Sequence, residues 1–597
     1  MCNMRVYPGK DCLAWVFCNL EGLEKEVVMK KLHTYVLKQW PFYLFALACM
    51  FIAIGLDMLY PQVTRIIINE VLVSGDMDRL AGLLAIILLC GVGRCICGYF
   101  KEITFDRTGS TIGTEMRKDL FGHIQGLSLD FFDKNNTGEL MARVKDDIDN
   151  IWSVVGYIGM LVVEVVVHVS CVLYCMFNLN WRLTFFPLVC MVACGVMAVI
   201  MERKLDKVYE DISEENAMLT TIAEENLSGV RTVKAFAREE FEIKKFLDHN
   251  RRYYDLNMRQ SKVWVKYFPF FQLVSGLLPV GTTILGGFEV LNGRMDIGSL
   301  FAYVEYSRNC TWPMQMVGWL TNALSSAIAS KKKIDKIVKE SAHLTEPKEP
   351  IILDEVRGEV AFDQVSFSID DKEILKDISF VVPEGKTLGI MGATGSGKST
   401  IINLLQRFYD PTEGQVSLDG VDVKELSFKQ VRGSNAIVLQ DVFLFSDTIA
   451  ENIKMGQKDT MTQEEIEAAA RFAQASGFVE EMEEKYETVI GERGVGLSGG
   501  QKQRISIARA VAKHAPILVM DDATSALDME TEREIQKELE ALENTTKIII
   551  AHRISAVRHA DEIIYLENGR IAERGTHEEL LEQKGLYYET YKVQYGE

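Results

Sequence analysis

The sequence predicts two kinds of domain in one chain, an α-helical membrane domain of six transmembrane helices followed by a cytosolic α/β domain. The first observation is hydropathy: the long apolar stretches all lie before about residue 330, whereas residues 350–597 have the mixed composition of a soluble domain. The second is a glycine-rich segment, Gly392–Ser399, which lies between a strand-like and a helix-like stretch, as phosphate-binding loops do. At 597 residues the chain is also too long for one compact domain.

Six segments are apolar over the roughly 20 residues that a helix needs to cross the bilayer core. They are 42–68, 80–105, 152–177, 183–202, 264–289 and 297–325. Asp57, Pro61 and Arg65 interrupt the first segment. The last two contain Gly and Pro, which transmembrane helices tolerate where neighbouring groups satisfy the freed backbone.

The connections between these spans differ in basic charge. The short connections, 69–79, 178–182 and 290–296, carry a single Arg each, whereas 106–150 and 203–262 are rich in Lys and Arg. Basic connections stay on the cytoplasmic side of a membrane. We therefore expect a multi-pass protein of the cytoplasmic membrane, with both long connections, both termini and the α/β domain in the cytoplasm.

Composition shifts give the domain boundaries. Lys331 marks the cytoplasmic end of the sixth span, and a polar stretch with two prolines leads to strand-like residues. We expect a membrane domain over 29–330, a linker over 331–357 and the α/β domain over 358–597. Residues 1–28 lack the pattern of a signal peptide, so we expect an N-terminal extension there, with Met29 as a candidate native start.

Two bulk features argue against other classes of protein. The net charge of −19 disfavours a general nucleic-acid binder, because binding a phosphate backbone needs a basic surface. Of the twelve cysteines, nine lie in or beside the apolar stretches and none lies in 350–597. We interpret these nine as small buried hydrophobes rather than as a disulfide framework or a metal site.

The glycine-rich loop carries the first chemical motif. Its glycines let backbone N–H groups surround phosphates, and the helix that begins there adds the positive end of its dipole. Lys398 would reach the β- and γ-phosphates, and the Ser399 hydroxyl would ligate Mg²⁺. The predicted nucleotide-binding residues of the loop are Gly392, Thr394, Gly395, Ser396, Gly397, Lys398, Ser399 and Thr400. The motif indicates a P-loop NTPase without saying of which class.

Further motifs follow the loop in the sequence. Gln440 opens one segment, the apolar run Ile517–Met520 ends in Asp521 and Asp522, and His552 lies further on. Between Gln440 and the apolar run stand Leu497, Ser498, Gly499, Gly500 and Gln501. In this order the motifs resemble the Q-loop, signature, Walker B and switch histidine of the ABC transporter superfamily, with the loop as Walker A. The resemblance covers nearly the whole chain after residue 30.

The resemblance implies a role for each of these residues. Gln440 and Asp521 would join Ser399 as ligands of Mg²⁺. Asp522, His552 and Gln440 would be catalytic, and the signature residues would hold the γ-phosphate of ATP bound to the opposite subunit. ATP and Mg²⁺ are therefore the expected substrate and cofactor.

The membrane half resembles the same superfamily. Phe131–Asp133 and Thr137–Leu140 look like the first intracellular loop of ABC exporters, and Glu225–Gly229 looks like the second. In exporters these loops end in coupling helices that dock on the nucleotide-binding domains. Importer permeases usually lie on separate chains, so the fusion seen here favours an exporter-type half-transporter.

Two residues depart from the family pattern. Asp522 stands where the family usually has a catalytic Glu; withdrawing a general base by ~1 Å can cost ~100-fold in rate. Ile369 stands where an aromatic side chain normally stacks on adenine, a contact of about 0.5–1.5 kcal/mol. Both departures belong to the half of the ATP site that contains the Walker A and Walker B motifs (the Walker side), whereas the signature motif is intact. This asymmetry resembles the degenerate-site subunit of bacterial heterodimeric multidrug exporters.

The sequence therefore predicts ATP-driven export of amphipathic substrates (drugs, lipids or peptides) by one half of a heterodimer, together with a second ABC half-transporter in the lipid bilayer. Two alternatives stay open. One is a homodimeric exporter that uses Asp522 as a weak base. The other is an ATP-gated or regulatory subunit that does not pump. A soluble ABC protein that handles nucleic acid is excluded by the six hydrophobic spans.

Ionisable side chains within the spans are candidates for the substrate pathway, because they are costly in a membrane. Glu164 and His168 lie four residues apart and share one helix face. We weigh a lumen-facing cation or proton site against an interhelical hydrogen bond, and slightly favour the latter. Asp57, Arg94 and Glu305 are the other candidates.

Overall fold

The computed structural model describes residues 32–369, 372–457 and 460–596. The predicted extension, 1–28, lies outside the described residues. The chain divides into two compact units. The first unit runs to Ser341, except that Ser128–Asp133 belong to the second unit, which continues from Ala342.

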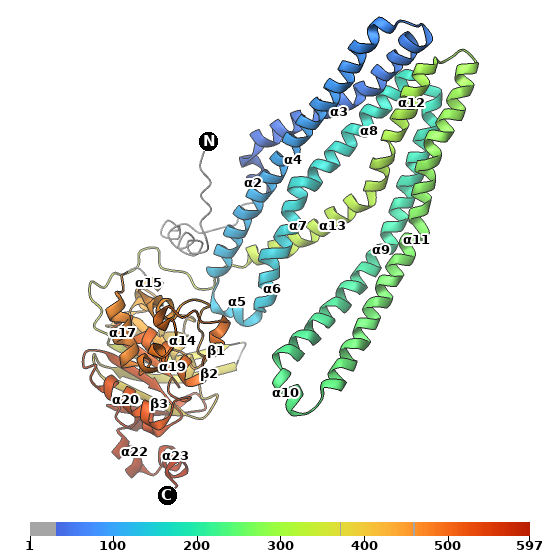
Figure 1. Ribbon diagram of the computed structural model, residues 1–597. Coiled ribbons are helices and arrows are strands. Elements are labelled where there is room, and N and C mark those ends of the chain that lie inside the picture. Colours follow the sequence, from blue (N-terminus) through green and yellow to red (C-terminus); the bar gives the residue numbers. More distant parts are fainter. Residues whose placement is uncertain (1–31, 370–371, 458–459, 597) are drawn as a thin grey trace. The chain divides into compact units, whose positions relative to one another are not determined.

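The first unit is helical, and its long helices are drawn from blue to yellow-green in Figure 1. They are α3 (Trp40–Ile66), α4 (Leu80–Gln125), α8 (Gly159–Leu179), α9 (Trp181–Ser228), α11 (Glu239–Leu291), α12 (Ile297–Asn309) and α13 (Thr311–Lys339). The shorter ones are α2 (Leu32–Lys38), α6 (Thr137–Ala142), α7 (Ile148–Ser153) and α10 (Val230–Ala235). Helix α3 packs along α4, and α9 packs along α11.

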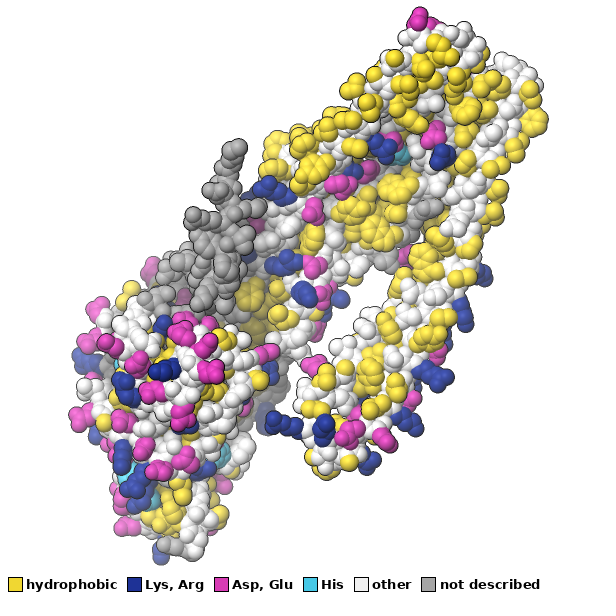
Figure 2. Space-filling view, viewed as in Figure 1, with side chains coloured by type: hydrophobic (Ala, Val, Ile, Leu, Met, Phe, Trp, Pro, Cys, Tyr) yellow, Lys and Arg dark blue, Asp and Glu magenta, His cyan; other side chains and the backbone are white. Residues whose placement is uncertain are grey.

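Five helical segments of the described chain are long and apolar enough to cross a membrane. They are Trp40–Val73, Met77–Gln125, Thr137–Leu179, Trp181–Ser228 and Glu239–Leu291. These contain the first five predicted spans. Figure 2 shows hydrophobic side chains over much of the visible surface of this unit, as expected where lipid replaces water.

The sixth predicted span, 297–325, is not among those segments. It is divided between α12 and α13, which meet at Cys310. Pro313 has no backbone N–H to donate and is tolerated in the first turn of a helix, so it favours a helix that restarts here over one that continues. Helix α12 has only 13 residues and includes Glu305 and Arg308. The structure thus describes this segment as two helices rather than one, and a sixth crossing stays a prediction.

The second unit contains two β-sheets. A six-stranded sheet has the order β10-β9-β3-β8-β7-β6 and is parallel except for β10. Its strands are β3 (Thr387–Gly392), β6 (Asn435–Val438), β7 (Ile517–Asp521), β8 (Thr546–Ile550), β9 (Glu562–Glu567) and β10 (Arg570–Gly575). A four-stranded antiparallel sheet consists of β2 (Lys372–Val382), β1 (Val360–Ile369), β4 (Glu413–Leu418) and β5 (Val421–Asp422), in that order.

The helices of this unit are mostly short. They are α5 (Leu129–Lys134, whose last residue is assigned to the first unit), α14 (Lys398–Leu405), α15 (Phe428–Gly433), α16 (Ile449–Ile453), α17 (Gln463–Phe472), α18 (Ser476–Glu480), α19 (Gly499–Val511), α20 (Met529–Glu540), α21 (Ile554–Val557), α22 (His577–Gln583) and α23 (Leu586–Tyr595).

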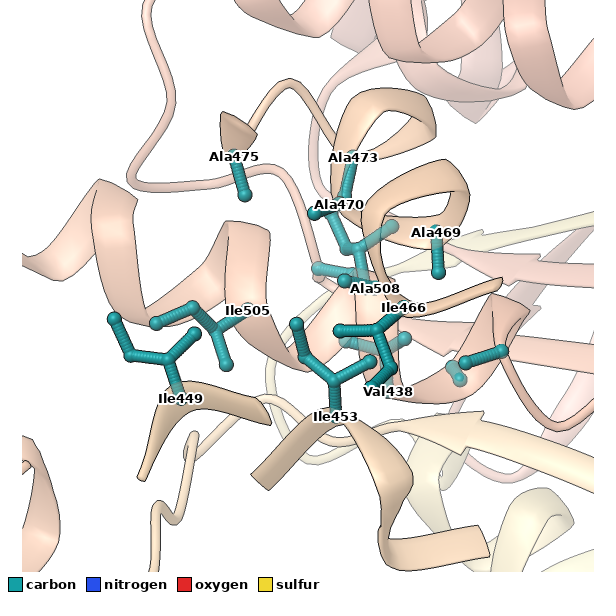
Figure 3. Close-up of a cluster of buried hydrophobic side chains, with 14 of the residues drawn as sticks. Val438, Ile449, Ile453, Ile466, Ala469, Ala470, Ala473, Ala475, Ile505 and Ala508 are labelled. Carbon is teal, nitrogen blue, oxygen red and sulfur yellow. The ribbon is translucent and has the colours of Figure 1, made fainter. Parts of the chain in front are cut away.

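Two buried clusters hold these elements together. One joins both sheets to α14 and includes Phe362, Phe380 and Ile401. In the other, Ile449 and Ile453 of α16 pack with Ile466 of α17 and with side chains of α19 and β6 (Figure 3). The first cluster fixes α14 against the sheet and the second fixes α19. The phosphate loop leads into the N-terminus of α14, and the signature segment forms the N-terminus of α19.

Candidate functional site

The parallel sheet brings four of the predicted site residues to one edge. Ile390 of β3 pairs with Ile550 of β8, which pairs in turn with Asp521 at the end of β7. Met520 of β7 pairs with Val438 of β6. Two residues after a paired position on each of these four strands comes a predicted site residue: Gly392, Gln440, Asp522 and His552. Ligands of open α/β sheets bind at this carboxyl edge of the strands.

The phosphate loop joins β3 to α14 through three glycines with positive φ: Gly392 (144°), Gly395 (82°) and Gly397 (102°). A Cβ on Gly392 would lie 2.3 Å from the Leu566 carbonyl oxygen, and one on Gly397 would lie 2.5 Å from a Leu375 methyl carbon. These two glycines are therefore required by close approach as well as by backbone conformation. Thr394 and Gly395 are exposed at the top of the loop, and Thr400 lies in the first turn of α14.

Lys398 is buried and folds back over this loop. Its Nζ donates to the carbonyl oxygens of Gly392 at 2.8 Å and Ala393 at 2.9 Å. Burial lowers the pKa of Lys398, and the nearby carboxylates of Asp521 and Asp522 oppose that shift. The lysine thus provides a positive charge at the centre of the loop.

The two serines of the phosphate loop, Ser396 and Ser399, differ in burial and in hydrogen bonding. The Ser399 hydroxyl donates to Asp521 Oδ2 at 2.9 Å. Ser396 is buried and its hydroxyl has no hydrogen-bond partner in the described chain. A buried hydroxyl without a partner is costly. The loop therefore fits an anionic ligand that would accept this bond, and the Ser399–Asp521 pair offers the hard oxygen atoms that Mg²⁺ prefers.

Asp521 and Asp522 differ sharply although they are neighbours. Asp521 ends the buried strand β7; burial raises its pKa, the Ser399 hydrogen bond lowers it and the Asp522 charge raises it. Asp522 leaves the strand with a φ of 47°, and its backbone N–H donates to the Ile550 carbonyl at 2.9 Å. The backbone of Asp522 is thus anchored, so the reach of its carboxylate depends on side-chain length.

The Leu497–Gln501 segment forms the N-terminus of α19. Ser498 caps the helix by accepting from the Gln501 N–H at 3.3 Å, and the Gln501 side chain accepts from the Ser498 N–H at 2.9 Å. Leu497 is half-buried, whereas Ser498 and Gly499 are exposed. A Cβ on Gly500 would lie 3.1 Å from the Ala526 carbonyl oxygen. This capped and exposed helix start resembles an anion site in form.

Three further predicted site residues lie at the surface. Gln440 is exposed just beyond β6, and Ile369 is half-exposed at the end of β1, opposite Lys372 of β2. His552 is exposed, and its carbonyl accepts from Gln594 Nε2 at 2.7 Å. The electrostatic influence of His552 is the smallest of those that lower the pKa of Asp521.

Family comparisons account for both units of the chain. Residues 43–314 match the ABC transporter transmembrane region and residues 375–525 match the ABC transporter domain. The uncharacterized ABC transporter ATP-binding protein YknU of Bacillus subtilis is 34% identical over 566 residues, which cover 93% of this chain and 96% of that protein. The chain belongs to the ABC transporter family.

Two other relatives agree with the exporter arrangement. The ATP-dependent lipid A-core flippase of Desulfotalea psychrophila is 34% identical over 575 residues, covering 96% of this chain and 100% of the flippase. A bacterial Atm1-family ABC exporter solved with ATP bound has a TM-score of 0.78 at 27% identity, covering 94% of this chain and 98% of that one. This ABC transporter is thus an ATP-hydrolysing exporter with fused transmembrane and nucleotide-binding domains.

Gln503 was not singled out by the sequence. It is buried on α19, where its Nε2 donates to Ser525 Oγ at 3.1 Å and its Oε1 accepts from the Ala526 N–H at 2.9 Å. The Ser525 hydroxyl in turn donates to the Asp522 carbonyl at 2.9 Å. This chain of hydrogen bonds links the signature helix of the ABC domain to the end of its Walker B strand. Nothing in the sequence spacing says that this glutamine points inward.

Lys101 was also missed, and it changes the interpretation of Glu164. Lys101 of α4 donates to both carboxylate oxygens of Glu164 on α8, at 2.9 and 2.8 Å. His168, one turn further along α8, is hydrogen-bonded to the backbone of Asn309. The structure therefore gives both residues interhelical partners in the membrane domain of this transporter. A role of either residue in the substrate pathway stays a prediction.

Proposed function

We propose that this chain is one half of a heterodimeric exporter of amphipathic substrates. It binds MgATP at a slow, degenerate site and lends an intact signature to the catalytic site of a second ABC half-transporter. The observation that carries the proposal is Asp522. Its backbone is held by the Ile550 carbonyl at 2.9 Å, so the missing methylene is not recovered by a shift of the main chain.

In this proposal different residues at the sheet edge bind the phosphates, bind Mg²⁺ and orient the attacking water. Lys398 and the loop from Gly392 to Thr400 hold the phosphates, and the Ser396 hydroxyl gains the acceptor that it lacks in the apo chain. Ser399, Asp521 and Gln440 hold Mg²⁺, which neutralises phosphate charge when bound. Asp522, Gln440 and His552 orient the attacking water, and Ile369 packs against adenine.

The signature serves the other subunit. Ser498 caps α19, and Gly499, Gly500 and Gln501 form its first turn, while Leu497 packs against the buried cluster that holds this helix. The positive end of the helix dipole then favours a γ-phosphate brought by the partner. Because this element has the family pattern throughout, we place rapid hydrolysis at the site that it completes.

The remaining assignments follow from the same proposal. The membrane domain covers 29–330, the linker 331–357 and the ATP-binding domain 358–597, with both termini in the cytoplasm. The relatives named as lipid A-core flippases and as a putative multidrug export protein support an amphipathic substrate. Within the membrane domain, Glu164 and His168 are kept only as helix-pairing residues near the substrate pathway.

The deciding experiment is Mg-ATP hydrolysis by the chain purified alone in lipid, beside the same chain co-expressed with a neighbouring ABC half-transporter. Negligible activity alone and strong activity together would establish the heterodimer. Equal activity per site in the chain alone would mean a homodimer in which Asp522 suffices. ATP binding without turnover in either preparation would favour the regulatory alternative.

A further inference from the structure

The loop that carries His552 is held by a side chain from α23. This loop joins β8 to α21 and consists of Ala551, His552 and Arg553. The Gln594 amide spans it: Nε2 donates to the His552 carbonyl oxygen at 2.7 Å, and Oε1 accepts from the Ile554 N–H at 2.9 Å. Gln594 is 42 residues after His552 in the chain. A single amide thus fixes the backbone from the carbonyl of His552 to the start of the next helix.

Helix α21 depends on this amide for its first turn. It has only four residues, and the side chain of Arg553, which precedes it, makes no capping hydrogen bond. The first N–H groups of a helix have no partner within the helix itself. The bond from the Ile554 N–H to Gln594 satisfies one of these groups from another element. The position of α23 therefore helps to determine where the loop ends and α21 begins.

Helix α23 is itself fixed to its neighbours. Its Tyr587 is fully buried, and the tyrosine hydroxyl lies 2.7 Å from Nδ1 of His577 on α22. The Glu573 carboxylate on β10 accepts hydrogen bonds from the N–H groups of Leu586 and Tyr587. Helices α22 and α23 pack together as the last two helices of the chain (Figure 1). Gln594 therefore reaches the loop from a helix that is anchored to the sheet.

One face of α23 serves both ends of the loop. Tyr587, Tyr591 and Gln594 lie on this face, four and three residues apart. The two tyrosines pack in a buried cluster that also contains Ala551 and Ile554, one at each end of the loop. Apolar contacts thus hold the ends of the loop, and Gln594 adds the hydrogen bonds to the backbone between them.

The hydrogen bond to the His552 carbonyl bears on the direction of the imidazole. It fixes the peptide plane that follows His552, and so limits the orientations from which the side chain can leave the backbone. His552 comes two residues after Ile550, which pairs with Asp521 at the end of β7. Misplacement of a reacting group by ~1 Å can cost ~100-fold in rate. A histidine on an exposed loop therefore needs a fixed backbone in order to act at this edge.

We propose that Gln594 is a positioning residue for His552, which it orients towards the γ-phosphate of ATP bound at the carboxyl edge of the sheet. This inference rests on the proposed function, because it takes His552 to act on the attacking water, which lies at the γ-phosphate. ADP has no γ-phosphate. The preference of the chain for ATP over ADP therefore reports on the position of the imidazole.

The test measures the binding of ATP and ADP, each with Mg²⁺, to the full chain in phosphatidylcholine nanodiscs by titration calorimetry. Asp522→Asn is present in every sample, so that ATP persists during the titration. His552→Ala should lower the preference for ATP about tenfold, and Gln594→Ala about threefold, because the imidazole is then retained but less well placed. The matched control is Gln583→Ala, which truncates an exposed glutamine on α22 and should leave the preference unchanged.

Gln594→Glu separates orientation from stability. The side chain has the same length, and its carboxylate still accepts from the Ile554 N–H but cannot donate to the His552 carbonyl. A negative charge at the start of α21 also favours that helix. We therefore expect the native melting temperature together with a loss of ATP preference as large as in Gln594→Ala. A native ATP preference in Gln594→Glu would contradict the positioning role.

A double variant shows whether Gln594 acts through the histidine. With His552→Ala in place, Gln594→Ala should change the ATP preference no further, because the group to be positioned is gone. Additive losses would overturn the inference, and so would an unchanged preference in Gln594→Ala where His552→Ala lowers it.

The outcomes also separate this inference from the proposed function. An unchanged preference in His552→Ala itself would refute the role that the proposed function gives to His552, and the positioning role with it. Rapid hydrolysis by the chain alone, without Asp522→Asn, would refute the degenerate site. It would leave the binding results, and the inference drawn from them, in force.

Discussion

The Walker side and the signature side of the nucleotide-binding domain differ in how they tolerate change. The signature side is a helix start held by reciprocal hydrogen bonds between Ser498 and Gln501. The Walker side is a strand end, where Asp522 is held through its backbone and its function depends on side-chain length. We therefore expect a change of one methylene at Asp522 to leave the fold intact and to alter the chemistry of the Walker side alone. Asymmetry between two ATP sites thus requires very little structural change.

The largest expected effect is on the signature side. In the assembled transporter, Ser498→Ala should lower ATP hydrolysis about 100-fold, the cost typical of losing one donor to a transition-state anion. Hydrolysis of Mg-ATP in lipid measures this. Thr462→Ala is the matched control, because Thr462 also caps its helix through a reciprocal pair, with Glu465, far from the motifs in sequence. Undiminished hydrolysis in Ser498→Ala would remove the asymmetric assignment.

On the Walker side, Asp522→Glu should move the carboxylate one methylene further out, to where the family's usual Glu places it. Turnover by the chain alone should rise by up to ~100-fold if the position of the base limits the rate. Asp522→Asn is the paired control and should leave no activity in the chain alone. If the Glu variant hydrolyses ATP no faster than the native chain, the limit lies elsewhere in the site.

Gln503 tests the connection between the two sides. Gln503→Ala leaves the Ala526 N–H and the Ser525 hydroxyl without their partner and should lower the free energy of unfolding by about 1–3 kcal/mol. Gln503→Glu keeps the acceptor for Ala526 but brings a carboxylate into a buried position, so at pH 7 its loss should be larger than that of Gln503→Ala. Chemical denaturation of the apo chain measures both, and a smaller loss in Gln503→Glu would contradict this account.

Substitution of Ile369, the residue proposed to pack against adenine, should have a smaller effect on nucleotide affinity. Ile369→Tyr adds an aromatic face worth about 0.5–1.5 kcal/mol, which corresponds to roughly two- to tenfold tighter nucleotide binding. Titration with a fluorescent ATP analogue measures the change. Ile369→Leu keeps an aliphatic side chain of the same size and should bind as the native chain does. Weaker binding in the Tyr variant would show that the pocket fits an aliphatic side chain.

The smallest effect concerns pH. Burial raises the pKa of Asp521, so its ionised form destabilises the folded apo chain. The stability that the neutral form gives is present below the unfolded pKa of about 3.9 and is lost as the pH rises through the higher folded pKa. Asp521→Asn should therefore raise the apo melting temperature at pH 7 and lose that advantage towards pH 4. A constant difference across this range would contradict the cause.

Much of the candidate site could be predicted because its motifs are local. A phosphate loop needs glycines at fixed steps, and the positive φ values of Gly392, Gly395 and Gly397 are properties of a short segment. The roles of the site residues stay predictions. Membrane spans were also predictable by length and hydropathy, except at 297–325, where Pro313 and the charges of α12 accompany a helix break at Cys310.

By itself, the sequence determined the two-domain plan, the family and the two departures, Ile369 and Asp522, because each depends on composition or on residues close together in the chain. Only the tertiary structure decided which side chains meet across long separations. Lys101 and Glu164 are 63 residues apart, and Arg94 and Asp57 are 37 apart. Helix packing determines which of these residues pair, because the sequence alone allows several pairings among the charged residues within the spans.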